Sequence, residues 1–284
     1  DLSKPNGVSS LSKKYPERAF EVGIAEQNMF CVAAGMSSYG FIPFITTFTP
    51  FATRRICDQI AISGLYAKQN VKIIGSDPGI SAEFNGGTHM SVEDIGVLRS
   101  IPGIVIFEPV DNIQLEKLLP KIVEYNGVVY IRMFRKAIDN VFNESDEFDL
   151  FKATTIQEGK DLTIFCSGIM VQETMLANKQ LKELGIDAEI INIHTIKPID
   201  REAVINSAKK TKAVLTVENH NVIGGLKSAV SEVLIEECPT VLRAIGIKDV
   251  FGQVGKMPYL KEVYKMRAQD IVEAAKDVIK LKQI

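Results

Sequence analysis

Short apolar runs alternate along this chain with longer stretches whose apolar residues recur at helical spacing. In the first half, four runs predict buried strands: FIPFIT (41–46), VKIIG (71–75), IVIFEP (104–109) and VVYIRM (128–133). Helical spacing is found instead at 26–39, 51–69, 92–100 and 112–125. Strands that are apolar on both faces and alternate with helices are typical of a parallel sheet covered on both sides. Ser91 and Asp111 are placed to cap two of these helices.

The alternation breaks at 139–152, where DNVFNESDEFDLFK is acidic, rich in turn formers and without either period. It then restarts with the strand-like runs DLTIFCSG, DAEIINI, AVLTVEN and TVLRAIGI, and a last helix is predicted from Ala268. A chain of 284 residues is long enough for two domains. We therefore predict two three-layer α/β domains with mainly parallel sheets, at 1–140 and 152–284, joined by a linker at 141–151.

Composition narrows the class of protein. Apolar residues make up 46% of the chain and charged residues 24%, with a net charge of −2 and no basic tract, so we expect neither a nucleic-acid nor a membrane partner. The four cysteines lie far apart in apolar contexts, and we expect buried, reduced thiols in a cytoplasmic protein. With three histidines and no CxxC or HxxxH pair, no metal site of the chain's own is predicted. Because the sequence opens at Asp1 without methionine, we expect a further segment upstream.

One acidic residue has an unusual setting. The segment ERAFEVGIAEQNMF (17–30) places Glu26 in the first turn of a predicted helix. A carboxylate there is commonly no more than a favourable charge at a helix N-terminus. The apolar neighbours Ile24 and Met29 favour the alternative that this carboxyl group exchanges a proton near neutral pH.

This segment resembles the one that carries the cofactor-activating glutamate of transketolases and deoxyxylulose phosphate synthases, in the motif GIAEQ. The resemblance implies that Glu26 hydrogen-bonds the aminopyrimidine of thiamine diphosphate and favours the tautomer that removes the thiazolium proton. The resemblance covers nearly the whole chain, and the chain corresponds to the C-terminal half of a full transketolase. The implied fold is a pyrimidine-binding domain followed by a transketolase C-terminal domain.

Further segments resemble binding segments of the same family. TTFTPFATRRICDQI (46–60) is similar to the aromatic segment against which the pyrimidine lies, which implies stacking on Phe51 and a second aromatic at Phe48. Core packing is an equal alternative for Phe48. In GGTHMSVED, His89 matches the histidine that contacts the sugar and helps to move its protons. Asp1, in Asp-Leu-Ser, resembles a residue near the cofactor.

The positions that would hold the substrate depart from the family pattern. Asp77 stands where transketolases usually have histidine, and Asn85 stands where they have aspartate. Both residues are implied substrate contacts, but their charge and donor pattern differ from those of the usual residues. Arg132, at the end of VVYIRM, matches the arginine that binds the substrate phosphate. The alternative is a surface cluster with Arg135 and Lys136 that the acidic linker balances.

The family's diphosphate-binding domain carries a GDG motif followed by asparagine, and this sequence has no such motif. The resemblance therefore implies a split enzyme whose N-terminal, diphosphate-binding subunit holds Mg²⁺ or Ca²⁺, in a heterotetramer with two copies of each chain. The expected reaction is transfer of a two-carbon ketol unit from a ketose, or ketose phosphate, to an aldose. Alternatives are a subunit like deoxyxylulose phosphate synthase or the 2-oxo acid dehydrogenase β chain, and a non-catalytic transketolase-like scaffold.

Overall fold

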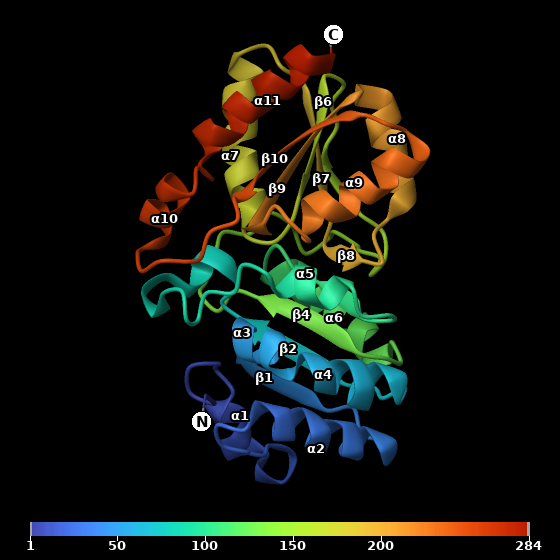
Figure 1. Ribbon diagram of the computed structural model, residues 1–284, viewed down its shortest axis with the longest axis vertical. Coiled ribbons are helices and arrows are strands. Elements are labelled where there is room, and N and C mark those ends of the chain that lie inside the picture. Colours follow the sequence, from blue (N-terminus) through green and yellow to red (C-terminus); the bar gives the residue numbers. More distant parts are fainter. Residues whose placement is uncertain (1, 283–284) are drawn as a thin grey trace.

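Two five-stranded sheets organise the chain (Figure 1). The computed structural model describes residues 2–282. The first sheet has the order β1 (Phe44–Phe48), β2 (Lys72–Ser76), β4 (Val129–Met133), β3 (Val105–Phe107), β8 (Thr195–Lys197). The second has the order β10 (Val241–Ile247), β9 (Ala213–Asn221), β6 (Leu162–Cys166), β7 (Ala188–Asn192), β5 (Thr154–Gln157). Among the described strands, only β8 and β5 pair antiparallel to their neighbours, so the predicted fold class is confirmed.

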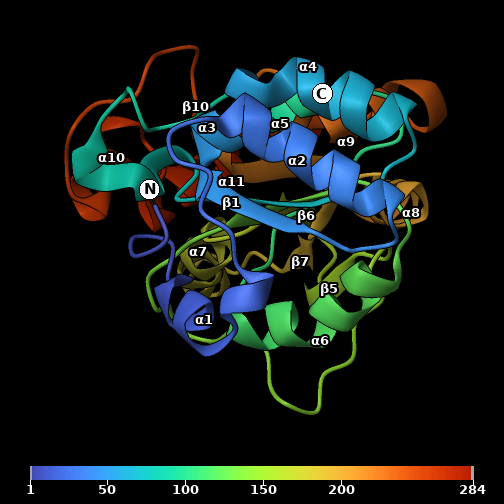
Figure 2. The ribbon, with the colours of Figure 1, turned by 90° about the horizontal axis from the view of Figure 1, so that it is seen from below.

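Helices cover both faces of each sheet. Figure 1 shows α7 (Met170–Glu183) and α11 (Ala268–Lys282) on one face of the second sheet, with α8 (Arg201–Thr211) and α9 (Leu226–Glu237) on the other. Figure 2 shows α2 (Glu26–Ser38) and α4 (Cys57–Gln59) on one side of β1 and α6 (Asn112–Glu124) on the other. The helices of the first half, together with α10, are α1 (Ser9–Lys14), η1 (Pro16–Arg18), α2 (Glu26–Ser38), α3 (Thr49–Ala52), η2 (Arg54–Ile56), α4 (Cys57–Gln59), η3 (Ile60–Tyr66), η4 (Gly79–Asn85), α5 (Asp94–Arg99), α6 (Asn112–Glu124) and α10 (Met257–Val263). Within the described residues, none of the helices combines the length and apolar character needed to cross a bilayer.

The helix predicted at 51–69 is interrupted. Thr53 has φ −130° and ψ −87°, which is not helical, so α3 ends there and η2, α4 and the π-helix η3 follow as separate turns. The Thr53 hydroxyl donates to the carbonyl of Thr49 at 2.7 Å. This break keeps the residues just after β1 in a compact turn beside the start of α2.

The predictions of Asp111 and Ser91 as helix caps had different outcomes. The Asp111 carboxylate accepts from the backbone N–H of Gln114 at 2.9 Å, which confirms it as the N-cap of α6. Ser91 is not the cap of α5, because that helix begins at Asp94 and Glu93 occupies the N-cap position. The expectation of buried thiols is also wrong for Cys31, which is exposed on α2.

The two halves of the chain share their packing. Strand β8 belongs to the second half of the sequence, yet it pairs with β3 at the edge of the first sheet. One buried apolar cluster contains Ile106 and Tyr130 from the first half together with Phe165 from the second. Gly224 has φ +83°, and a Cβ on it would lie 2.8 Å from the Cα of Gly96. Glycine is therefore required where the α5 segment meets the loop before α9.

Candidate active site

Glu26 is the first residue of α2. The chain turns into this helix at Gly23, whose φ of +73° is readily adopted only without a side chain. The Glu26 side chain is 11% exposed, and its Oε1 accepts from Nη1 of Arg55 at 3.0 Å. The preceding Ile24 is 77% exposed, so the apolar setting predicted for Glu26 is not closed by this chain alone.

Three of the predicted residues form one aromatic group. Phe48 ends β1 and Phe51 lies in α3, with ring centroids 6.4 Å apart. The His89 ring approaches both edge-on, 5.6 Å from Phe48 and 5.2 Å from Phe51 between centroids. The Thr88 hydroxyl lies 2.9 Å from His89 Nδ1. Phe48 is buried, whereas Phe51 and His89 are half-buried and keep part of their surface available to a ligand.

Arg55 connects Glu26 to this aromatic group, and sequence reasoning did not select it. Its guanidinium carbon lies 4.0 Å from the centroid of the Phe51 ring while Nη1 pairs with Glu26. The Arg55 carbonyl accepts from Nε2 of Gln27 at 3.3 Å, which ties η2 to α2. The only available signal was its position four residues after Phe51. We call Glu26, Phe48, Phe51, Arg55 and His89 the Glu26 cluster.

Asp77 and Asn85 begin and end one loop beside this cluster. Asp77 follows β2 with φ +52°, and its buried carboxylate accepts from both the backbone N–H and the Nε of Arg135. Burial raises the pKa of Asp77, and the neighbouring Arg135 opposes this shift. Asn85 is exposed at the end of η4.

The expectation that Arg132 binds a substrate phosphate is contradicted. Its guanidinium is completely buried, donates to Asp94 at 2.7 Å and 3.2 Å and to the carbonyl of Asn219 at 2.7 Å, and pairs with Glu108. Burial opposes the charge, but Asp94 and Glu108 hold the pKa of Arg132 above its ordinary value. These contacts leave no open face for a ligand. We call Arg132, Asp94, Glu108 and Tyr130, whose hydroxyl donates to Asp94 at 2.8 Å, the Arg132 network.

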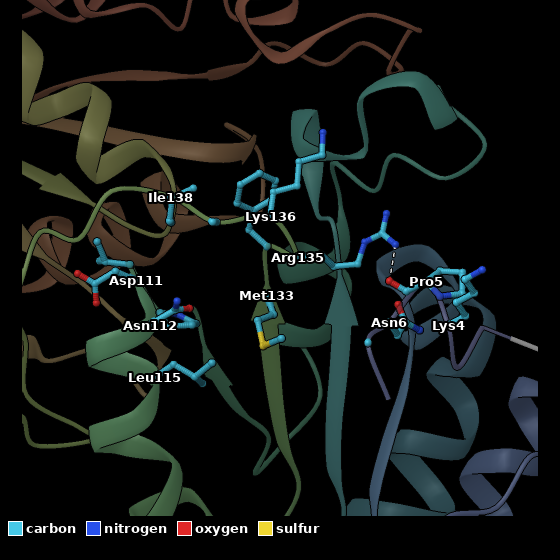
Figure 3. Close-up of a pocket in the computed structure, with 15 residues that line it drawn as sticks. Lys4, Pro5, Asn6, Asp111, Asn112, Leu115, Met133, Arg135, Lys136 and Ile138 are labelled. Atoms are coloured by element: carbon cyan, nitrogen blue, oxygen red, sulfur yellow. Dashed lines mark hydrogen bonds between the residues drawn. The ribbon is translucent and has the colours of Figure 1, made fainter. Parts of the chain in front are cut away.

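Arg135 and Lys136 are the exposed cations of this segment. Lys136 pairs with Glu83, and Arg135 lies 4.9 Å from the Phe48 ring centroid. Both residues line a cavity of about 410 Å³, which Figure 3 shows between the segments 4–7, 109–115 and 133–138. Across it Arg135 donates to the carbonyl of Pro5 at 2.6 Å. Arg135 is therefore the arginine of this segment that reaches the Glu26 cluster.

Further groups lie outside the Glu26 cluster. Asp1, expected near the cofactor, lies outside the described residues. Among residues 2–282, no group of three or more His, Cys, Asp or Glu side chains is arranged to hold a metal ion. The other two histidines, His194 and His220, are both buried, and His194 Nε2 lies 2.9 Å from the carbonyl of Asp149.

Comparison with known proteins identifies related sequences and folds. Residues 1–140 match the family model of the transketolase pyrimidine binding domain, and residues 152–271 match that of the transketolase C-terminal domain. The chain is 51% identical over 282 residues to the 6-deoxy-6-sulfo-D-fructose transketolase subunit SqwH of Clostridium sp. (strain MSTE9), covering 99% of this chain and 88% of that one. It is 39% identical over 284 residues to a putative transketolase C-terminal section of Methanocaldococcus jannaschii, covering 99% and 89%.

A solved structure has the same fold throughout. It is described as a split gene transketolase in an inactive β4 tetramer, and it matches with a TM-score of 0.91 at 41% identity. The match covers 99% of this chain and 91% of that chain. The likeness therefore extends over both sheets and the segments that carry the Glu26 cluster.

Proposed function

Since this chain belongs to the transketolase family, we propose that it is the C-terminal subunit of a split, thiamine diphosphate-dependent transketolase. The enzyme moves a two-carbon ketol unit from a ketose to an aldose acceptor. The observation that carries this proposal is the Glu26 cluster, in which contacts of Arg55 and His89 with Phe51 bring a carboxylate, an aromatic face and an imidazole together.

The residues of the cluster fit the pyrimidine half of the cofactor. When bound, thiamine diphosphate supplies the carbanion nucleophile. Glu26 holds and shares a proton at the pyrimidine ring nitrogen, and the half-buried Phe51 offers a face for stacking. His89, held edge-on between Phe48 and Phe51, contacts the sugar and moves a proton on its hydroxyl groups.

The far end of the substrate is proposed to meet residues at the loop that Asp77 begins. Asn85 is exposed and offers both a donor and an acceptor to a hydroxyl group. Arg135 takes the role first expected of Arg132, because its side chain is 26% exposed and lies beside Phe48, whereas that of Arg132 is completely buried. Asp77 already pairs with Arg135, so this end of the site carries less positive charge than an unpaired arginine would give. Donors with and without a phosphate group both belong in the test.

A second polypeptide is proposed to hold the diphosphate and its Mg²⁺ or Ca²⁺ ion. The names of the relatives support a partner, since one is called a transketolase subunit and another a C-terminal section. Large apolar side chains also stand exposed on and around α2 and η3, at Phe20, Ile24, Tyr39, Phe41 and Tyr66. Such exposed side chains are candidates for contact with the partner. We propose a heterotetramer with two copies of each chain.

The free thiols support a proposal about the cell compartment. All four cysteines are free, which is usual for proteins of a reducing compartment. We therefore propose a cytoplasmic location, which fractionation of the source cells tests directly.

The test combines this chain with its diphosphate-binding partner, thiamine diphosphate and Mg²⁺. Ketol transfer is measured over a panel of phosphorylated, sulfonated and unmodified ketoses, with Glu26→Ala as the inactive control. We expect cofactor-dependent transfer that the variant abolishes. A wild-type complex that binds no thiamine diphosphate rejects the enzyme assignment, whereas one that binds cofactor but ignores every sugar phosphate corrects only the substrate.

A further inference from the structure

We propose that Arg55 is a placeholder for the aminopyrimidine ring of the cofactor. In the cofactor-free chain its guanidinium engages the two groups that Glu26 and Phe51 offer to that ring. The inference rests on the proposed function, because it concerns the same carboxylate and the same aromatic face.

The geometry brings both contacts to one side chain. Nη1 of Arg55 lies 3.0 Å from Oε1 of Glu26, and its guanidinium carbon lies 4.0 Å from the centroid of the Phe51 ring. The other neighbours of that ring, Phe48 and His89, approach it edge-on. Arg55 therefore lies over the Phe51 ring, where a stacked ligand would also lie.

The guanidinium of Arg55 and the aminopyrimidine of the cofactor have similar shape and hydrogen-bonding chemistry. A guanidinium is planar, carries N–H donors along its edge and stacks on aromatic rings. An aminopyrimidine is also flat and forms hydrogen bonds at its edge. While Glu26 accepts from Arg55, its oxygen Oε1 is engaged by a guanidinium rather than by a ring nitrogen. Both flat groups cannot occupy this position together, so Arg55 must leave when the cofactor binds.

Arg55 is free to leave, unlike the arginine beside it. Its side chain is 44% exposed, and Glu26 and Phe51 are its side-chain partners among the described contacts. The neighbouring Arg54 is equally exposed at 43%, but it pairs with Glu93 at 2.6 Å, away from the Glu26 cluster. Arg54 is therefore a matched control, with the same charge on the same turn.

The placeholder makes cofactor binding depend on a conformational change. A ligand that binds only the open form has its apparent affinity reduced by the fraction of molecules that are open. In the closed form Arg55 contacts Glu26 and Phe51, and in the open form it does not. One partly exposed ion pair and one cation–π contact together favour the closed form by roughly tenfold. Until the cofactor binds, Arg55 would thus satisfy Glu26 and cover Phe51.

The test measures the dissociation constant of thiamine diphosphate by isothermal titration calorimetry, in the complex with the diphosphate-binding subunit. We expect Arg55→Ala to bind the cofactor roughly tenfold more tightly than wild type, and Arg54→Ala to bind it unchanged. Equal or weaker binding by Arg55→Ala overturns the placeholder alone. If none of the three complexes binds thiamine diphosphate, the proposed function fails and the placeholder fails with it.

A second measurement needs no variant that must fold and assemble. The wild-type chain, labelled with ¹⁵N-arginine, is titrated with 4-amino-5-hydroxymethyl-2-methylpyrimidine, the cofactor's pyrimidine without its diphosphate. We expect the Nε–H resonance of Arg55 to move toward that of a solvated arginine as the probe binds, while that of Arg54 stays in place. A bound probe that leaves the Arg55 resonance unchanged overturns the inference.

Discussion

The Glu26 cluster and the Arg132 network contain the same kinds of residue and behave in opposite ways. In the network, the guanidinium of Arg132 is completely buried and donates to three groups of the interior. In the cluster, the guanidinium of Arg55 is 44% exposed and rests on the two groups that a ligand would need. A buried and fully paired charge serves the fold, whereas a half-open one is available for exchange. Residue type and motif do not separate these two cases, but exposure and pairing do.

The largest expected effect is on activity and comes from a substitution in the Glu26 cluster. Glu26→Gln keeps the size of the side chain but removes the group that shares a proton, so ketol transfer should fall by about 10² to 10⁴-fold. The free energy of unfolding should change little, because the carboxylate lies at a helix start and contributes one partly exposed ion pair. Steady-state kinetics of the complex and urea unfolding of the chain measure the two quantities. A variant with near-normal activity would remove Glu26 from the mechanism.

In the Arg132 network, Arg132→Met should instead lower the free energy of unfolding. It leaves Asp94 and Glu108 buried without their cation, and breaking a buried pair costs about 3–5 kcal/mol of unfolding free energy. Arg243→Ala is the control, since the side chains of Arg243 and its partner Asp277 are 45% and 54% exposed and losing this pair should cost less than about 1 kcal/mol. Urea unfolding of the three proteins compares them. Equal stabilities would mean that the network contributes nothing to holding the fold.

A smaller effect should appear when the pH is lowered. Burial lowers the pKa of His194 from its ordinary value of 6.5, although the nearby Asp149 opposes this shift. The unfolded chain then binds a proton that the folded chain does not, so the free energy of unfolding should fall below about pH 6.5, by at most about 1.4 kcal/mol per pH unit from this residue. His194→Gln should flatten that slope in urea unfolding at about pH 5 and about pH 7. An unchanged slope would assign the acid sensitivity to other groups, His220 first among them.

The smallest effect concerns the pair formed by Asp77 and Arg135. Asp77→Asn keeps the shape and tolerates the φ of +52°, but it removes the negative charge beside the guanidinium. The KM for phosphorylated donors should fall by about 2- to 5-fold with kcat steady, because a partly exposed ion pair contributes less than about 1 kcal/mol. Unphosphorylated donors supply the control and should keep their KM. A uniform change for both donor types would show that Asp77 acts on the loop rather than on charge.

Much of the fold could be read from periodicity, because its central strands are apolar on both faces. Strands β5 and β8 were missed, since they are four and three residues long at sheet edges and too short to carry a period. The break at Thr53 was missed as well, because the apolar spacing continues through it.

The site was predicted unevenly. Glu26, Phe51 and His89 come together as the motif order implied. Arg132 was misjudged because its counter-charges, Asp94 and Glu108, lie on other elements, and pairing over such distances leaves no local pattern. Arg55 was missed for the same reason, since its role depends on Glu26 lying next to it in space.

Strand β8 has a consequence for anyone who divides this chain. A cut in the segment between the two predicted domains would strip the first sheet of its edge strand and expose the backbone of β3. Unpaired edges of this kind favour aggregation. The smallest soluble product of limited proteolysis or truncation should therefore be the intact pair of sheets, and the two family domains should melt in one cooperative transition rather than in two.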